Sequence, residues 1–438
     1  MKILVVSHNC FSSTQNMGKT FVSLFSQFEK HELMQLYVYP SIPNVDVCDS
    51  YFRITDQQVV KAILKRKHCG GEVQPDLQVT TGTFESPDTE KRYNSINRNT
   101  SLTRRARDVA WKLGKWKSKE LKAWLENGKP DAVFYALGDA SFSQNIAMWV
   151  ARYLGIPLIT YVCDEYYFSG KQAKGFDRLI NAGMLANIKK TIRRSQLVIS
   201  ICDDLGELYQ TAFGTPYRTI MTGSAFASGS IVHEAGERTQ ISYIGNLALN
   251  RWRSILDIQD ALNRYHETHE RRYELVYYGR EHTELSGKVT YGGFLDPAGI
   301  REVMGRSYML VHIETFDREF RARLKYSVST KIADSLASGT CLLAYGPEEL
   351  ASIRHLERNA CAGCITDKAV LDARLSALLD DPALVEQYAE AGMKVASLHH
   401  SSERNSRSLY EAIAQMIASR SEDRTGEVRA STNRQDGI

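Results

Sequence analysis

One segment in the C-terminal half of the chain combines residue types that bind phosphate and sugar groups. Ser329 or Thr330 is a good helix cap, and a helix that begins there would present free backbone N–H groups and a positive dipole end to an anion. Lys331 would lie in the first turn, where the dipole disfavours a cation unless a phosphate is bound. Asp334, one turn later, could accept hydrogen bonds from a sugar hydroxyl. An ordinary capped helix has the same spacing, so both interpretations stay open.

A second segment with phosphate-binding character follows an apolar run at residues 241–244. It reads Gly245-Asn-Leu-Ala-Leu-Asn-Arg251. Glycine lets a phosphate approach the backbone, and arginine can hold it with two donors. A plain turn with a surface arginine would look the same. Glu314 directly follows the apolar run 308–313, where it would either line a site or make a structural hydrogen bond.

Short apolar runs alternate with helical segments along two stretches of the chain. The first begins at Ile3-Leu-Val-Val-Ser7, and the second restarts at Ile241. Such alternation predicts parallel sheets with helices on both faces, in which ligands bind beyond the carboxyl ends of the strands. We expect an N-terminal domain at 1–225, a C-terminal domain at 238–400, a helix at 401–419 that crosses back to the N-terminal domain, and a disordered tail at 420–438.

The order of these motifs resembles that of the family-4 glycosyltransferases, which have the GT-B fold, and the likeness extends over nearly the whole chain. Those enzymes open their C-terminal domain with Gly-Arg-Leu-x-x-x-Lys. Here Gly245 and Leu247 match that pattern, Arg251 falls on the lysine position, and Asn246 replaces the arginine.

Two glutamates separated by seven residues also mark the family, the second followed by Leu/Met-Ala-x-Gly. Asp334, ahead of Leu336-Ala-Ser-Gly339, falls on the second position, and Tyr326 falls on the first, where it cannot supply a carboxylate. Members that build bacterial surface polysaccharides carry Ser-Thr-Lys-Ile before that carboxylate, as this chain does. The chain also resembles them in His312-Ile-Glu-Thr-Phe-Asp317 and in Thr14-Gln-Asn-Met-Gly-Lys-Thr20.

The resemblance implies two Rossmann-like, doubly wound parallel-sheet domains that face each other across a cleft. It also implies a nucleotide-diphosphate sugar donor, UDP rather than GDP, with no metal or other cofactor and with retention of anomeric configuration. Arg251 and Lys331 would stabilise the leaving diphosphate, and Glu314 would take over the sugar-hydroxyl role lost at Tyr326. The expected donor site consists of Gly245, Asn246, Arg251, Ser329, Thr330, Lys331 and Asp334.

The same resemblance places the acceptor saccharide on the N-terminal domain, beside the first loop and the strand ends. The candidate residues are Asn16, Gly18, Lys19, Asp139, Asp164 and Glu165. Many family members have a His-Asp pair where this chain has Cys163 and Asp164. Asp164 or Glu165 could therefore orient or deprotonate the acceptor hydroxyl. A structural aspartate at a strand end, or an ordinary glycine at a helix start for Gly18, explains the same residues.

Residues 104–124 combine basic side chains with Trp111, Trp116 and Trp124, and they lie in a predicted helix at 101–126. Such a helix would suit an anionic membrane surface and a lipid-linked acceptor. An ordinary amphipathic helix with its tryptophans in the core has the same period.

The bulk composition narrows the class of protein. The 438 residues are 43% apolar with a net charge of +4, which indicates ordinary globular domains and does not favour nucleic acid as a partner. No apolar run reaches the roughly 18 to 20 residues of a membrane span, and no signal peptide is evident. The eight cysteines are scattered, and Cys361 and Cys364 lack the second pair that zinc would need. We expect a cytoplasmic protein that works at the inner face of the cell membrane.

Two other functions would keep the same fold. A nucleotide-sugar 2-epimerase usually needs additional carboxylates and histidines at the cleft, which the sequence does not reveal. A non-catalytic GT-B subunit that binds a partner enzyme would explain the missing carboxylate at Tyr326 and the missing histidine beside Asp164.

Overall fold

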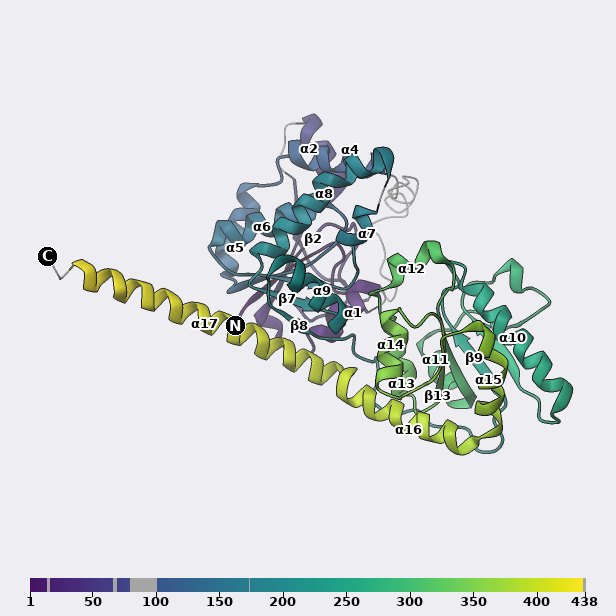
Figure 1. Ribbon diagram of the computed structural model, residues 1–438. Coiled ribbons are helices and arrows are strands. Elements are labelled where there is room, and N and C mark those ends of the chain that lie inside the picture. Colours follow the sequence, from purple (N-terminus) through teal and green to yellow (C-terminus); the bar gives the residue numbers. More distant parts are fainter. Residues whose placement is uncertain (14–15, 66–68, 79–100, 173, 436–438) are drawn as a thin grey trace. The chain divides into compact units, whose positions relative to one another are not determined.

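The computed structural model describes the chain except for residues 14–15, 66–68, 79–100, 173 and 436–438, and it also leaves out the side chains of 16, 101, 176, 180 and 421–435. Contacts divide the chain into two compact units (Figure 1). Unit 1 consists of Met1–Ile220 together with Ser406–Ile438, and unit 2 consists of Met221–Asn405. Unit 1 is therefore built from both ends of the sequence.

Unit 1 contains a sheet in the order β4-β3-β2-β1-β5-β6-β7-β8. All described pairings in it are parallel except that between β3 and β4. The central strands β1, β5 and β6 are apolar runs buried on both faces, as parallel strands between helices must be, whereas the edge strands β4 and β8 are short and partly exposed. Their bounds are β1 Ile3–Ser7, β2 Leu33–Tyr37, β3 Ser50–Arg53, β4 Gly71–Val73, β5 Ala132–Ala136, β6 Leu158–Val162, β7 Leu197–Ser200 and β8 Tyr217–Thr219.

Helices cover both faces of this sheet, as the strand–helix alternation predicts. They are α1 Asn16–Leu24, α2 Asp56–Lys65, α4 Ser101–Leu113, α5 Lys119–Gly128, α6 Ser141–Leu154, α7 Tyr167–Lys171, α8 Gly175–Arg194 and α9 Asp203–Phe213, with a 3-10 turn at Lys30–Glu32. One core cluster joins β1, β5 and β6 to Phe21 of α1 and to Phe25, which directly follows that helix. The same cluster includes Leu409 and Ile413, which come from the last helix of the chain.

The basic stretch forms two helices, where the sequence predicts one helix over 101–126. The break falls at Gly114, where a Cβ would lie 2.6 Å from Val59 Cγ1, so close packing on α2 favours glycine there. Ser118 then caps α5 by accepting a hydrogen bond from the Leu121 N–H at 3.0 Å. The tryptophans at 111, 116 and 124 are all buried. The amphipathic-helix alternative therefore accounts for the tryptophans, and membrane contact through other side chains of this stretch stays a prediction.

Unit 2 contains a second sheet, in the order β11-β10-β9-β12-β13-β14, and every described pairing in it is parallel. Its strands are β9 Gln240–Ile244, β10 Glu274–Tyr278, β11 Thr290–Tyr291, β12 Ser307–Ile313, β13 Cys341–Tyr345 and β14 Gly363–Ile365. The order along the sheet reverses at β9, which pairs with β10 on one side and with β12 on the other. This is the doubly wound arrangement that the sequence predicts.

The helices of unit 2 pack on both faces of its sheet around one large apolar core. They are α10 Arg251–Thr268, α11 Pro297–Arg306, α12 Arg318–Leu324, α13 Thr330–Ala337, α14 Ala351–Arg358, α15 Leu371–Asp380 and α16 Pro382–His399, with 3-10 turns at Thr283–Leu285 and Lys368–Val370. The expected α/β fold class of both units is confirmed.

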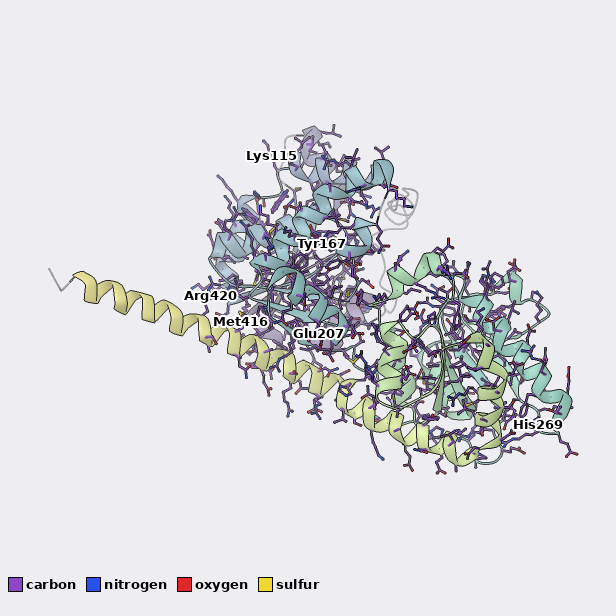
Figure 2. The ribbon with its side chains drawn as sticks, in the orientation of Figure 1. Lys115, Tyr167, Glu207, His269, Met416 and Arg420 are labelled. Atoms are coloured by element: carbon purple, nitrogen blue, oxygen red, sulfur yellow. The ribbon has the colours of Figure 1, made fainter. Side chains whose placement is uncertain are left out.

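The last helix, α17 Ser402–Gln435, begins in unit 2 and belongs to unit 1 from Ser406 onward. Met416 of this helix packs against the core of unit 1, and Arg420 follows one turn later (Figure 2). Composition predicts a disordered tail after residue 419, whereas the structure continues the helix to Gln435. Arginine and glutamate, which recur in this segment, are good helix formers.

Candidate functional site

The candidate donor site lies at the point of unit 2 where the strand order reverses. Gly245 directly follows β9, and Glu314 directly follows the neighbouring strand β12. In doubly wound sheets the crevice at such a point, beyond the carboxyl ends of the strands, is where ligands bind. Gly245 and Glu314, which follow separate apolar runs in the sequence, thus lie at the same edge of the sheet.

Glycines allow the backbone to pack tightly at this edge. A Cβ on Gly245 would lie 2.5 Å from Tyr243 Oη. Gly279, after β10, has a φ of +135°, and a Cβ there would lie 2.4 Å from the carbonyl oxygen of Gly245. Gly346, after β13, is similar, because its Cβ would lie 2.8 Å from Glu314 Cβ. Side chains are therefore excluded from positions where a ligand could approach the backbone.

Arg251 and Glu314 form a half-buried ion pair across the reversal point. Leu249 and Asn250 both adopt left-handed backbone conformations, with φ of 60° and 58°, and α10 begins directly after them at Arg251. The Nε and Nη2 atoms of Arg251 donate to Glu314 Oε2 at 2.9 and 2.7 Å. Burial raises the pKa of Glu314, and Arg251 opposes this shift. The loop after β9 is thereby tied to the end of β12.

Lys331 reaches the same place from α13. Ser329 caps this helix, with its Oγ accepting a hydrogen bond from the Lys331 N–H at 3.4 Å. A Cβ on Gly245 would lie 3.0 Å from Lys331 Nζ, so the ammonium group rests against that glycine. Burial on that side lowers the pKa of Lys331, and the charge of Arg251 lowers it further, although the residue keeps an exposed face. Two cations thus meet beside the end of β9.

His312 is the residue of this cluster that sequence reasoning missed. It lies two positions before Glu314 on β12, and its Nε2 is 3.7 Å from Glu314 Oε1. Burial and then the charges of Arg251 and Lys331 lower its pKa to about 3, so the ring is neutral at physiological pH. Its Nε2 is buried without a hydrogen-bond partner among the described residues. Strand alternation gives a signal for it, since residues i and i+2 share a face.

The other predicted donor residues have different positions. Asn246 is exposed and its Oδ1 accepts a hydrogen bond from the Ala248 N–H at 2.8 Å, which shapes the loop before α10. Thr330 is exposed at the start of α13. Asp334 Oδ1 accepts from Ser224 Oγ at 2.9 Å and from the Ala225 N–H at 2.8 Å. These contacts fasten α13 to the segment that enters unit 2, and they give Asp334 a structural function.

Unit 1 has its own reversal point, between β1 and β5. Gly18 lies in the first turn of α1, and a Cβ there would lie 2.7 Å from both Ser12 Cβ and the Cys10 carbonyl oxygen. The glycine is thus needed for the loop after β1 to pack against the helix. Lys19 is exposed on α1. Asn16 is the first residue of α1, and its side chain lies outside the described part of the structure.

Three predicted carboxylates of unit 1 follow strands β5 and β6. Asp139 is exposed and pairs with Arg104 at 3.2 Å. Asp164 is exposed and accepts from Tyr166 Oη at 3.3 Å. Glu165 is buried, and its two carboxylate oxygens accept from the Phe168 and Ser169 N–H groups at 2.6 and 2.7 Å. Glu165 is therefore occupied in holding the start of α7, and Asp164 is the carboxylate that a ligand can reach.

Within the described residues, no group of three or more His, Cys, Asp and Glu side chains is arranged to hold a metal ion. A search of the same residues finds no helix with the length and apolar character that a membrane crossing requires.

Comparisons with known proteins identify the fold. Residues 253–411 match the family model described as glycosyl transferase-like. Solved glycosyltransferase structures cover 95% to 97% of this chain. The chain has the GT-B fold. The resemblance inferred from the motifs is confirmed at this level, and the assignment to family 4 stays a prediction.

Three solved GT-B structures illustrate the match. Sucrose-phosphate synthase from Thermosynechococcus elongatus has 11% identity and a TM-score of 0.59, covering 96% of this chain and all of that one. Anabaena HepE in complex with UDP has 11% identity and a TM-score of 0.60, covering 95% of this chain and all of that one. The trehalose 6-phosphate synthase of Burkholderia multivorans has 10% identity and a TM-score of 0.59, covering 97% and 98%. The sequence matches no curated protein at a significant level.

Proposed function

We propose that this GT-B protein transfers a sugar from a UDP-sugar to a hydroxyl group of a saccharide acceptor. The observation that carries the proposal is the convergence of Arg251 and Lys331 on the glycine edge at the end of β9. Among the described residues, Glu314 pairs with Arg251 and no carboxylate pairs with Lys331, so a diphosphate would supply the missing negative charge. HepE, which shares the fold, was crystallised with UDP and with UDP-glucose, which supports UDP as the nucleotide.

The two cations would perform the electrostatic part of the reaction. As the sugar leaves, negative charge grows on the diphosphate, and fixed cations lower the energy of that state more than the energy of the bound donor. Arg251 is held in place by Glu314 and Lys331 by its helix, so little reorganisation is needed. We propose that these side chains serve instead of a metal ion and that the anomeric configuration is retained. The acceptor would be held by unit 1, with Asp164 orienting its hydroxyl.

A donor screen tests this proposal. The protein is incubated with a panel of nucleotide sugars and a membrane extract, and free nucleotide and glycosylated product are followed. Acceptor-dependent release of UDP, insensitive to EDTA, is expected, with losses of roughly 100-fold or more in kcat for Arg251→Ala and Lys331→Ala. NMR of the product gives the anomeric configuration. Epimerised donor without an acceptor, or binding without turnover for every donor, would replace the proposal by one of the two alternative functions.

We further propose that the acceptor is lipid-linked and that unit 1 binds the cytoplasmic face of a membrane, through side chains other than the tryptophans. Helix α4 contacts both α2 and α8 at one end of unit 1 (Figure 1). These helices expose Leu64, Leu102 and Leu113, each about two-thirds exposed or more, and Val109 continues the stripe along α4. Exposed basic residues surround them, including Lys61, Lys65, Arg105, Lys112 and Lys115. Apolar side chains with flanking cations suit an anionic lipid surface.

Vesicle flotation tests the membrane contact. Binding to vesicles containing anionic lipid is expected to fall at least fivefold in a Leu102→Glu/Leu113→Glu double variant. Leu398→Glu, at a leucine on α16 of unit 2 that is 52% exposed, serves as the control and should bind like the parent. Equal flotation of all three proteins would exclude this surface without affecting the proposed transfer reaction.

A further inference from the structure

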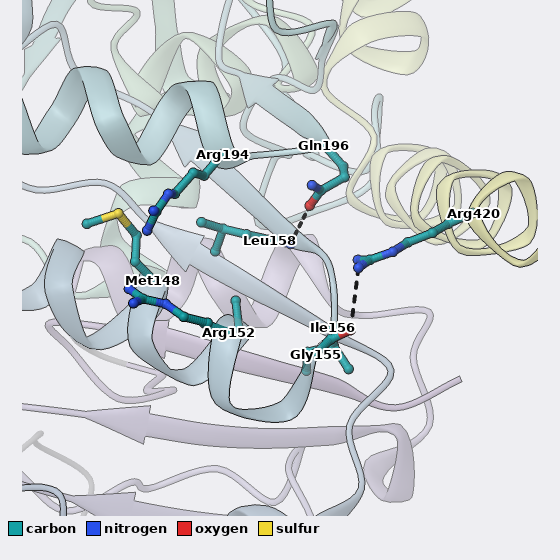
Figure 3. A pocket seen from close by; sticks show the side chains of 9 residues that line it. Met148, Arg152, Gly155, Ile156, Leu158, Arg194, Gln196 and Arg420 are labelled. Carbon is teal, nitrogen blue, oxygen red and sulfur yellow. Dashed lines mark hydrogen bonds between the residues drawn. The ribbon is translucent and has the colours of Figure 1, made fainter. Parts of the chain in front are cut away.

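A cavity of about 320 Å³ opens in unit 1 among residues that the proposed reaction does not use. It lies beside the loop that leads into β6 and the residue that precedes β7 (Figure 3). These are the amino ends of the strands, whereas Asp164 follows β6 at its other end. Since β6 has five residues, the cavity is about 16 Å from that carboxyl edge. The lining residues are Met148, Ala151, Arg152, Gly155, Ile156, Leu158, Arg194, Gln196 and Arg420.

Three arginines from three different helices line this cavity. Arg152 comes from the last turn of α6, Arg194 from the last turn of α8 and Arg420 from α17. None of them forms an ion pair with a carboxylate of the described residues. Arg420 donates from Nη2 to the Gly155 carbonyl oxygen at 3.4 Å, and its Nη1 is buried without a hydrogen-bond partner in the described structure.

Gln196 adds a neutral donor to the same cavity. Its Oε1 accepts a hydrogen bond from the Leu158 N–H at 2.8 Å, so the orientation of the amide is fixed and its NH2 group is left as the donor. Figure 3 shows this contact and the Arg420 contact on the side of the cavity away from Met148. The polar atoms that the side chains can offer inside the cavity are therefore donors.

Helix dipoles explain part of this arrangement. A cation in the last turn of a helix is favoured, which accounts for a positive charge on Arg152 and on Arg194. It does not account for a third arginine, Arg420, in the lining of the same cavity, where Figure 3 shows it on the side opposite the Arg152 and Arg194 guanidinium groups. Three like charges around one cavity repel one another. A bound anion with several negative charges would replace this repulsion by attraction. Guanidinium groups match phosphate oxygens with two parallel hydrogen bonds.

We propose that this cavity, the arginine pocket, binds the phosphate groups of a small phosphorylated molecule. Its volume is at the lower end of the range of small-molecule sites, which suits a pyrophosphate or a sugar phosphate rather than a whole nucleotide sugar. Because Arg420 belongs to α17, the ligand would also fasten this part of the helix to α6 and α8. The arginine pocket is thus an anion site separate from the donor site, and it does not depend on the proposed transfer reaction.

Calorimetric titration tests the proposal with inorganic phosphate, pyrophosphate and glucose 6-phosphate as probes. The full chain carries Lys331→Met throughout, so that binding at the donor site does not mask the signal. The affinity for the tightest-binding probe should fall at least tenfold in each of the variants Arg152→Gln, Arg194→Gln and Arg420→Gln. Arg193→Gln is the matched control, because Arg193 is exposed beside Arg194 but does not line the pocket. Arg194→Lys, which keeps the charge and loses the paired donors, should give an intermediate affinity.

Hydrogen exchange provides a second measurement. It distinguishes binding in the arginine pocket from nonspecific attraction of the anion to a basic surface. The bound probe should slow exchange in α17 around residues 409–420, and Arg420→Gln should abolish that protection. The proposal is overturned if no probe binds at millimolar concentration, if Arg193→Gln weakens binding as much as Arg194→Gln, or if binding leaves α17 exchange unchanged.

Discussion

Among changes in the donor site, Lys331→Met most clearly separates an effect on UDP binding from an effect on the stability of the folded protein. The ammonium group rests beside Gly245 and near Arg251, and its pKa is lowered in the folded protein. A pKa below the unfolded value means that the unfolded chain holds the proton more tightly. The charge therefore destabilises the native state at neutral pH, and its removal should leave the unbound protein equally stable or more stable.

The same substitution should weaken UDP binding strongly. A phosphate oxygen about 4 Å from the ammonium gains on the order of 1 kcal/mol if fully solvated and about 4 kcal/mol near a protein surface. Because Lys331 is half enclosed, we expect a loss of about 2 to 3 kcal/mol, or roughly 30- to 150-fold in affinity. Bound UDP should also raise the Lys331 pKa, so that binding at alkaline pH takes up protons.

Titration calorimetry and thermal unfolding measure these effects together. UDP affinity is determined in two buffers of different ionisation enthalpy, which reports the proton uptake, and melting is followed without ligand. Lys394→Met, at an exposed lysine of α16, is the control and should change neither quantity. A UDP affinity within threefold of the parent, or a melting temperature several degrees lower without ligand, would refute the assignment of Lys331 to the diphosphate.

Three further predictions follow from buried groups. Glu314→Gln leaves Arg251 without its carboxylate and should lower the free energy of unfolding by about 3 kcal/mol in urea denaturation; a loss below 1 kcal/mol would contradict the structural pairing. Gly279→Ala brings a methyl group against the backbone after β10 at a φ of +135°, and should cost at least about 2 kcal/mol in the same assay, so a neutral result would disprove the close packing. His355 and His400 have Nε2 atoms 3.0 Å apart, and burial lowers their pKa values to about 3 and 4. Since both protonate near pH 6.5 when unfolded, stability should fall as pH drops from 6.5 toward 4, by about 2 kcal/mol per histidine at pH 5; a flat profile over that range would contradict their neutral burial.

Sequence reasoning located the central strands and the residues that follow them, because apolar runs and their alternation with helices are local properties. It did not predict the short strands β3, β4, β8 and β14. The family resemblance placed Gly245 and Lys331 in one expected site before their contact was known. Sequence reasoning left open whether Glu314 binds a sugar or makes a structural contact, because its partner Arg251 is 63 positions away. Asp334 was likewise unpredictable, since the Ser224 hydroxyl that it holds lies 110 positions earlier.

The same limit explains why alternatives stayed open in unit 1. A period of 3.6 residues fits both a membrane helix and a core helix, and only the packing of α4 and α5 against their neighbours showed that the tryptophans are buried. Glu165 illustrates a related point. Its position after a strand suggested chemistry, but the two N–H groups that it caps belong to a helix whose start the sequence does not mark clearly.

The division of unit 1 between the two ends of the chain has a consequence for folding during synthesis. Leu409 and Ile413 complete the core around β1 and β5, but they leave the ribosome after all of unit 2 has been made. Part of the apolar surface of the N-terminal sheet therefore stays exposed to solvent during this time. The 185 residues from Met221 to Asn405 are synthesised before the chain can cover it. Unit 2 has all its own strands in one stretch and can fold first. A nascent chain stopped shortly after residue 405 should consequently contain a protease-resistant C-terminal half and a chaperone-dependent N-terminal half.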